Sequence, residues 1–222
     1  MDWTALWLSL RLAGWTVIIL LPVAVFFGRF LAHRDFWGKG FAEALVALPL
    51  VLPPTVFGFY LLISFGANSP IGQTWQGLFG HQLVFSFDGL LIALVISNLP
   101  FAVQPAQRGF EAIALDVREA AACCGMSPLS VLWKVELPLA WPGLMTGMVL
   151  VFAHTLGEFG VLLMVGGSIP GETKTIAIAI YDRVQAFDNH GAAIMSATLL
   201  AISLVTITIT FWLSRRVGQR FG

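Results

Sequence analysis

The middle of the chain contains, at residues 89–107, the sequence GLLIALVISNLPFAVQPAQ. These 19 residues carry no charge, although Asp88 and Arg108 flank them directly. About 20 mostly apolar residues form a helix that crosses the hydrocarbon core of a bilayer. A charge at the centre of such a helix costs about 2.5–3.5 kcal/mol, so spans are expected in charge-free windows. We therefore predict a membrane-spanning helix over 87–107.

Four more charge-free windows extend this pattern along the chain. Runs of 17, 44, 21 and 26 uncharged residues follow Arg11, Glu43, Glu136 and Asp188. The second half of the longest run opens with turn-forming residues at 68–73, so one helix followed by a polar external loop is expected there. The sequence thus predicts an all-α polytopic bundle, one transmembrane domain over 1–222. Its five spans are expected near 7–31, 42–66, 87–107, 140–165 and 190–213.

The composition of the chain agrees with a membrane protein. Of its 222 residues, 58% are hydrophobic and 11% charged, and the mean hydropathy is +0.85. Soluble domains carry about 25% charged residues, and this composition also excludes disorder and a basic nucleic-acid binder. The two cysteines, Cys123 and Cys124, are adjacent and cannot frame a disulfide scaffold, so we interpret them as small apolar residues in a reduced compartment.

The distribution of Lys and Arg predicts the orientation, because cytoplasmic segments of membrane proteins are enriched in these residues. If the first span runs from outside to inside, nine of the twelve basic residues fall on inner segments. These nine are Arg29, Arg34, Lys39, Arg108, Arg118, Lys134, Arg215, Arg216 and Arg220. The outer segments hold Arg11, Lys174 and Arg183. The N-terminus is therefore expected outside and the C-terminus in the cytoplasm.

The inner segment 108–138 carries signals for two short helices. Asp116 can cap the first helix and Glu119 follows three residues later, which approximates a capping box. Gly125 suits the position just after a helix end.

Ser127 and Pro128 repeat the start signal for a second helix, and Leu137-Pro138 is expected to end it before the next span. An ordinary capped loop is one interpretation. The small side chains of the first helix also suit close approach by another protein, with the helices acting as a rigid lever.

The residues of this loop carry a family resemblance. Glu119-Ala120-Ala121, then Gly125, and after nine further residues Val135 with Leu137-Pro138, resemble the EAA loop of binding-protein-dependent ABC importer permeases. Val135 replaces the usual isoleucine. Further stretches resemble the molybdate branch of that family, and the resemblance covers about residues 10–214. These stretches are 48–54, 127–129, 156–160 and 169–176.

The resemblance implies a transport subunit that binds no cofactor and is not an enzyme. ATP would be used by two separate ATP-binding subunits, and a periplasmic binding protein would deliver an oxyanion, molybdate ahead of tungstate and sulfate. Two copies of the chain, a homodimer in the bacterial inner membrane, would form an alternating-access pathway. The sequence agrees, since it has no phosphate-binding loop of the nucleotide-binding type and no metal-ligand spacing. The ATPase-coupling residues implied are Glu119, Ala120, Ala121, Gly125, Ser127, Pro128, Leu137 and Pro138.

Polar and helix-breaking residues inside the predicted spans are candidates for the pathway or its gate. Prolines in a span free backbone carbonyls, which are tolerated only where they face protein or a cavity. His154 and Glu158 lie four residues apart on one helical face, where Glu158 would repel an anion and therefore suits a gate or a structural contact better than a ligand site. The candidates are Pro49, Pro53, Pro54, Asn98, His154 and Glu158.

The same residues also allow structural roles, and the chain as a whole allows two rival functions. Membrane helices are richer in proline than soluble ones, and the Gly143-x-x-x-Gly147 motif predicts close helix packing, inside one subunit or across a dimer. A self-sufficient secondary carrier or channel would need an ion relay or an inverted repeat. A membrane-embedded enzyme would need several converging polar groups within the bilayer.

Overall fold

The computed structural model describes the backbone of residues 1–221, and the side chains of these residues except 122 and 209–221. Within this part the chain is helical and forms no strand, which confirms the predicted all-α class. Four helical segments are long and apolar enough to cross a membrane. They are α1 (Trp3–His33), α5 (Phe87–Glu111), the continuous run Pro128–Gly157, and α11 (Asn189–Phe221), of which Asn189–Thr208 meets the test.

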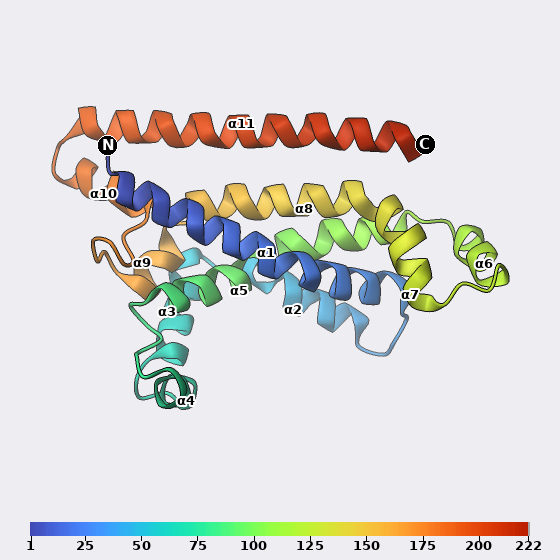
Figure 1. The fold of residues 1–222 in the computed structure, drawn as a ribbon. Helices are drawn as coiled ribbons and strands as arrows, with labels where there is room; N and C mark the ends of the chain where they lie inside the picture. Colours follow the sequence, from blue (N-terminus) through green and yellow to red (C-terminus); the bar gives the residue numbers. More distant parts are fainter. Residues whose placement is uncertain (222) are drawn as a thin grey trace.

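Shorter elements connect and interrupt these long helices. The long run Pro128–Gly157 itself consists of three parts, one of which is a π-helical turn called η1. Figure 1 shows α6 at one end of the bundle and α9 and α10 at the other. The bounds are α2 Lys39–Val51, α3 Pro54–Phe65, α4 Pro70–Phe79, α6 Leu115–Cys123, α7 Pro128–Val131, η1 Leu132–Glu136, α8 Leu137–Gly157, α9 Gly160–Gly166 and α10 Ile176–Gln185.

The core of the bundle is α5, which lies between α1 and α8 (Figure 1). Glycines let these three backbones approach closely. A Cβ built at Gly143 of α8 would lie 2.5 Å from the Pro105 carbonyl oxygen of α5, and one at Gly28 of α1 would lie 2.8 Å from the Ala106 Cβ. Small residues favour such contacts in membranes, where packing replaces the hydrophobic effect between helices. The glycine motif of α8 is thus used inside one chain.

The second predicted span, 42–66, is two helices instead of one. The axes of α2 and α3 are bent by 109° at the short break between them. Leu52 and Pro53 both adopt extended backbone conformations, and Pro54 is the first residue of α3. The residue before a proline disfavours the helical region, and two consecutive prolines extend this restriction, so the chain turns sharply instead of kinking.

The segment from α7 to α8 also differs from the prediction. Leu137-Pro138 does not end the second loop helix, because η1 continues it into α8 with the Leu137 N–H bonded to the Leu132 carbonyl. Proline has no N–H to donate in a helical hydrogen bond, but it is tolerated in the first turn of a helix, where that N–H would have no partner. The π-helical turn η1 places Pro138 in the first turn of α8. The predicted span 140–165 is itself broken after Gly157, where Glu158 adopts an extended conformation.

Two smaller differences concern helix starts. The first loop helix begins at Leu115, so Asp116 lies in its first turn and is not the residue before it. The expected polar loop after the second span contains α4, whose start is capped by the Ser69 hydroxyl accepting from the Gly72 N–H at 2.9 Å. Serine followed by proline is a strong helix-start signal, which explains why this segment folds.

An ion pair stabilises the turn that joins α10 to α11. The carboxylate of Asp188 accepts a hydrogen bond from the Gly191 N–H at 2.9 Å and pairs with Arg183. The backbone bond first, and then the Arg183 guanidinium, hold the pKa of Asp188 below its ordinary value. A lowered carboxyl pKa means that this contribution to stability is present at neutral pH and is lost as the pH falls through the folded-state pKa.

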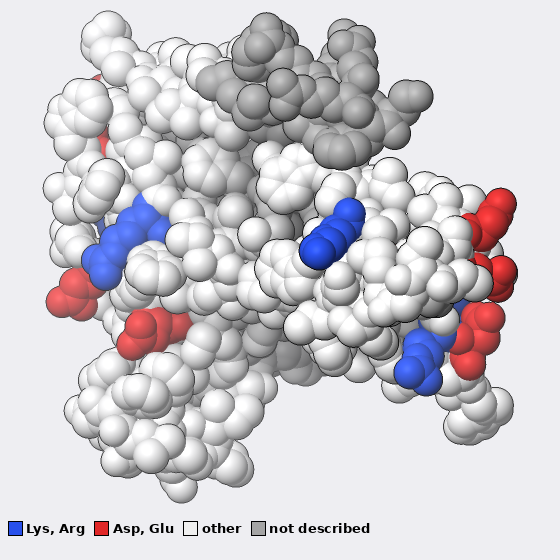
Figure 2. Space-filling model, turned by 45° about the vertical axis from the view of Figure 1, so that its right-hand side comes forward, with Lys and Arg blue, Asp and Glu red and all other residues white. Residues whose placement is uncertain are grey.

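The surface of the bundle suits a bilayer. In Figure 2 the charged side chains gather toward two sides of the molecule, with an uncoloured surface between them. Large apolar side chains are exposed along the long helices, among them Phe26 at 65% and Val205 at 57%. The chain is therefore a multi-pass membrane protein.

Replacing Gly143 with alanine is expected to destabilise the bundle by about 1–3 kcal/mol, the usual cost of overpacking, because the added methyl group would push α5 and α8 apart. Thermal unfolding of the purified protein in detergent measures this. Gly157→Ala on the same helix is the matched control, since a Cβ there meets no atom within 4 Å. Equal melting temperatures for the two variants would contradict the close-packing interpretation.

Candidate functional site

The loop residues selected from the sequence form a sharp corner between α6 and α7. We call residues 115–131 the elbow. Gly125 has φ +73°, the left-handed conformation that glycine adopts without strain. The Met126 N–H bonds to the Ala121 carbonyl at 3.3 Å, a bond typical of a glycine-terminated helix. The Ser127 hydroxyl then accepts from the Ser130 N–H at 3.3 Å and caps α7.

Most of the elbow candidates are open to solvent. Glu119, Ala120 and Gly125 are exposed, as are Ser127 and Pro128. Ala121, in contrast, is buried at 8% exposure and packs within the chain. Leu137 and Pro138 are half-buried and lie beyond the elbow, at the start of α8. Cys123 and Cys124 are both exposed in the elbow and form no disulfide bond with each other. The exposed part of the elbow is a surface that another protein can contact.

Glu136 attaches the elbow to the bundle. This carboxylate is fully buried and lies between two arginines from different helices. Its Oε2 accepts from Arg29 Nε of α1 at 2.5 Å, and its Oε1 accepts from Arg118 Nε of α6 at 3.1 Å. One side chain in η1 therefore joins the elbow, the first membrane helix and the base of α8. We call Arg29, Arg118 and Glu136 the charge triad.

The charge triad is costly to disrupt. Desolvation offsets much of the attraction in a buried ion pair, but removing one partner leaves an uncompensated charge and typically costs about 3–5 kcal/mol. In the sequence, Glu136 marks only the edge of a charge-free window, and nothing local relates it to Arg29, 107 residues away. Its place beside the EAA-like residues is the one signal that points to it.

Three of the gate candidates lie together at the other end of α8. The Asn98 side chain of α5 is fully buried, and its Oδ1 lies 3.2 Å from Nδ1 of His154. The same amide donates from Nδ2 to the Leu94 carbonyl at 2.8 Å. His154 Nε2 is in turn 3.5 Å from Glu158 Oε2. The structure thus joins Asn98, His154 and Glu158 in one polar chain, which we call the outer cluster.

Glu158 has a structural role as well. It ends α8, and its Oε1 accepts from the Val161 N–H at 3.0 Å, so that the carboxylate caps the start of α9. A negative charge is stabilised at a helix start. The structure therefore shows Glu158 making polar contacts at a helix break that the sequence analysis did not predict.

The two helix breaks contact each other. A Cβ built at Gly160, the first residue of α9, would lie 2.8 Å from the Cβ of Pro54 in α3. Pro53 and Pro54 are exposed at the break between α2 and α3, and Pro49 is half-buried within α2. Of the proline candidates, Pro54 is therefore the one at this contact, two residues along the chain from Glu158 of the outer cluster. The elbow lies at the opposite end of the bundle (Figure 1). In the part of the chain with described side chains, no group of His, Cys, Asp and Glu could hold a metal ion.

Comparison with known proteins gives a consistent set of relatives. The molybdenum transport system permease protein ModB of Azotobacter vinelandii is 44% identical over 215 residues, covering 97% of this chain and 95% of that protein. ModB of Escherichia coli K12 is 35% identical, covering 100% and 97%. A probable sulfate transport system permease protein cysT of Chlorella vulgaris is 35% identical over 81% of this chain and 67% of its own length.

A solved structure shares the fold at low sequence identity. The crystal structure of a bacterial alginate ABC transporter, in complex with an alginate-bound periplasmic protein, contains a chain that matches with a TM-score of 0.77 and 15% identity. The match covers 96% of this chain and 78% of that one. The family of binding-protein-dependent transport system inner membrane components matches residues 24–221. With that match and full-length relatives, this chain belongs to the binding-protein-dependent transport system inner membrane component family.

Proposed function

We propose that this chain is the permease subunit of an ATP-driven importer that moves molybdate across the bacterial inner membrane by alternating access. The observation that carries the proposal is the charge triad, because it links an exposed elbow rigidly to the helices that span the membrane. Identity of 44% over almost the whole length of a molybdenum permease supports the substrate. Tungstate and sulfate remain the alternative oxyanions, and the sulfate relative supports its alternative less well because it matches a smaller share of the chain.

The elbow is the part proposed to receive the ATP-binding subunits. Glu119, Ala120 and Gly125 are exposed at its tip, where they are free to contact a partner. The excess of basic residues on the segments at this end of the chain supports a cytoplasmic elbow, with the N-terminus outside and the C-terminus inside. Two ATP-binding subunits would dock on the elbows of two copies of this chain, and a periplasmic oxyanion-binding protein would dock on the opposite face.

The charge triad suggests how movement of the elbow reaches the pathway. An ATPase that pulls on α6 pulls on Arg118, and the buried carboxylate of Glu136 passes this displacement to Arg29 of α1 and to the base of α8. The continuous helix from α7 through η1 to α8 has no hinge of extended residues to absorb the motion. The displacement therefore travels along α8 toward the outer cluster.

The outer cluster and the two helix breaks are the proposed gate. Broken helices in membranes are tolerated where their freed backbone groups line a cavity or face protein. Pro54 and Gly160 form the contact between the breaks. Asn98, His154 and Glu158 interact at the end of α8, two residues before Gly160. Because Glu158 would repel an anion and already caps α9, its role here is to hold the gate and not to bind molybdate.

Reconstitution tests the proposed activity directly. In proteoliposomes, molybdate uptake is expected only when the ATP-binding subunits, ATP and the binding protein are all present. The measurement is uptake of labelled molybdate. Excess unlabelled tungstate or sulfate is then added, and the decrease in molybdate uptake measures how well each alternative anion competes. Flux that persists without the ATP-binding subunits would instead favour the secondary carrier or channel.

Replacing Gly125 with valine is expected to uncouple transport, because a β-branched residue is strained at positive φ, a conformation that costs L-residues about 1–2 kcal/mol. Binding of the ATP-binding subunits in a pull-down and ATP-dependent molybdate uptake should both decrease. Gly40→Val is the control, since Gly40 has no positive φ and a Cβ there meets no atom within 4 Å. Normal subunit binding and normal uptake in Gly125→Val would contradict the proposal that the elbow couples the ATP-binding subunits to transport.

Replacing Glu136 with glutamine is expected to lower the free energy of unfolding by about 3–5 kcal/mol, since two arginines lose their buried countercharge. In molecules that remain folded, ATP hydrolysis should continue while molybdate uptake per ATP falls. Asp35→Asn is the control, because Asp35 is fully exposed in its pair with Lys39 and such pairs contribute about 0–1 kcal/mol. Unchanged stability and unchanged uptake per ATP would show that the charge triad does not transmit motion.

A further inference from the structure

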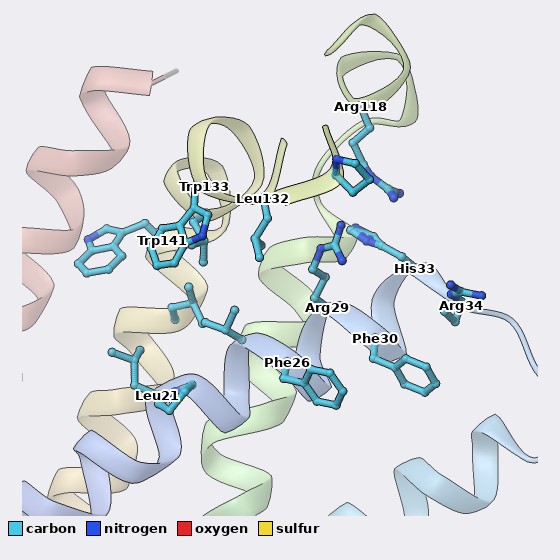
Figure 3. A pocket seen from close by; sticks show the side chains of 15 residues that line it. Leu21, Phe26, Arg29, Phe30, His33, Arg34, Arg118, Leu132, Trp133 and Trp141 are labelled. Atoms are coloured by element: carbon cyan, nitrogen blue, oxygen red, sulfur yellow. The ribbon is translucent and has the colours of Figure 1, made fainter. Parts of the chain in front are cut away.

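A cavity of about 680 Å³ lies beside the charge triad, between the end of α1 and the run from α7 to α8. Its two ends differ in chemistry (Figure 3). Arg29, His33 and Arg118 converge at the end near α6, with Arg34 beside them, whereas Leu21, Phe26 and Trp141 line the other part. The cavity therefore has a basic end and an apolar end.

The basic end has more positive than negative charge. No carboxylate is among the described residues that line the cavity, and the neighbouring Glu136 is shared by Arg29 and Arg118 behind this end. Arg34 is exposed and pairs with no carboxylate among the described residues. The Nδ1 atom of His33 is buried and has no hydrogen-bond partner in the same part of the chain. Three guanidinium groups against one carboxylate leave donors available for an anion.

The apolar end is open on the outside of the bundle. Phe26 is 65% exposed and Trp133 is 66% exposed. Phe30 and Trp141 are also exposed. Tryptophan is enriched at the membrane–water boundary, where its apolar ring and N–H group suit both environments. The cavity thus combines apolar walls that fit an acyl chain with a cluster of cations at its other end.

We propose that this cavity binds an anionic phospholipid of the inner leaflet, with its phosphate between Arg34 and the charge triad and its acyl chains along Phe26 and Trp133. The choice of leaflet rests on the proposed cytoplasmic position of the elbow. Basic pockets between membrane helices on this side of the bilayer suit anionic headgroups. A bound phosphate would compete with Glu136 for Arg29 and Arg118. It would therefore change the strength of the ion pairs that attach the elbow to the bundle.

A free oxyanion fits the cavity less well than a lipid does. A small dianion needs converging donors and no apolar wall, yet Phe26, Trp133 and Trp141 form much of this surface. A phospholipid uses both ends, because its phosphate pairs with arginine while its chains remain in the hydrocarbon region. The charge complementarity and the exposed aromatic side chains together select the lipid.

Native mass spectrometry of the full-length protein in detergent tests the proposal, with dioleoyl-phosphatidylglycerol as the probe and dioleoyl-phosphatidylcholine as the neutral comparison. One tightly bound phosphatidylglycerol per chain is expected, with weaker binding of phosphatidylcholine. Arg34→Gln should weaken phosphatidylglycerol binding about fivefold, because one basic residue near a membrane surface contributes about 1 kcal/mol. Arg34 lies outside the charge triad, so this variant is expected to fold.

Arg108→Gln is the matched control, since Arg108 is an exposed arginine on the same predicted side of the membrane but lies outside this cavity. Equal effects of the two substitutions, or equal binding of both lipids, would overturn the proposal. Brominated phosphatidylglycerol in nanodiscs gives a second measurement, in which quenching of tryptophan fluorescence should fall in Trp133→Phe.

Unchanged quenching, or displacement of the lipid by millimolar inorganic phosphate or molybdate, would also overturn the proposal, since the cavity would then be covered by another chain or hold a free anion. These readouts need neither ATP nor transport. Their failure is therefore distinct from failure of the proposed importer function.

Discussion

The elbow of this protein depends on the ion pairs of one buried carboxylate, Glu136. A carboxylate without exposure to water must be paired, because an isolated buried charge is far too costly. Arg29 and Arg118 supply the pairing from α1 and α6, and so hold the elbow at the end of the membrane helices. Without this pairing, α6 would be joined to the bundle mainly through the chain that precedes and follows it. The position of the elbow is therefore set by electrostatics more than by apolar packing.

The opposite end of the bundle is built on different physics. There, backbone restrictions imposed by Pro53 and Pro54 break one helix, and the capping carboxylate of Glu158 starts another after a second break. At the contact, the backbone of Gly160 packs against the ring of Pro54 so closely that an added Cβ would lie 2.8 Å from the Pro54 Cβ. Such a contact separates at lower cost than a buried ion pair, which suits the proposed gate at this end and the rigid joint at the other.

Between the two ends, close packing of α1, α5 and α8 leaves little room for internal rearrangement. Gly28 and Gly143 place the backbones of α1 and α8 against α5, and packed interiors transmit displacement instead of absorbing it. The π-helical turn η1 keeps the helix continuous through Pro138. The proposed coupling thus runs along a stiff path from the elbow to Asn98 and His154, and the proposed lipid site lies beside the beginning of this path.

Local patterns in the sequence were sufficient to predict the all-α membrane class and the helical segments of the inner loop, because hydrophobicity, charge spacing and capping signals act over one or two helical turns. They also selected Gly125, Ser127 and His154 with Glu158, whose positions follow from local backbone conformation or helical spacing. The folded chain was needed to see that Glu136 joins Arg29 to Arg118, that Pro54 meets Gly160, and that α7 continues into α8. These features depend on contacts between residues far apart in the chain, or on how neighbouring helices compensate for a proline, and no local pattern encodes such contacts.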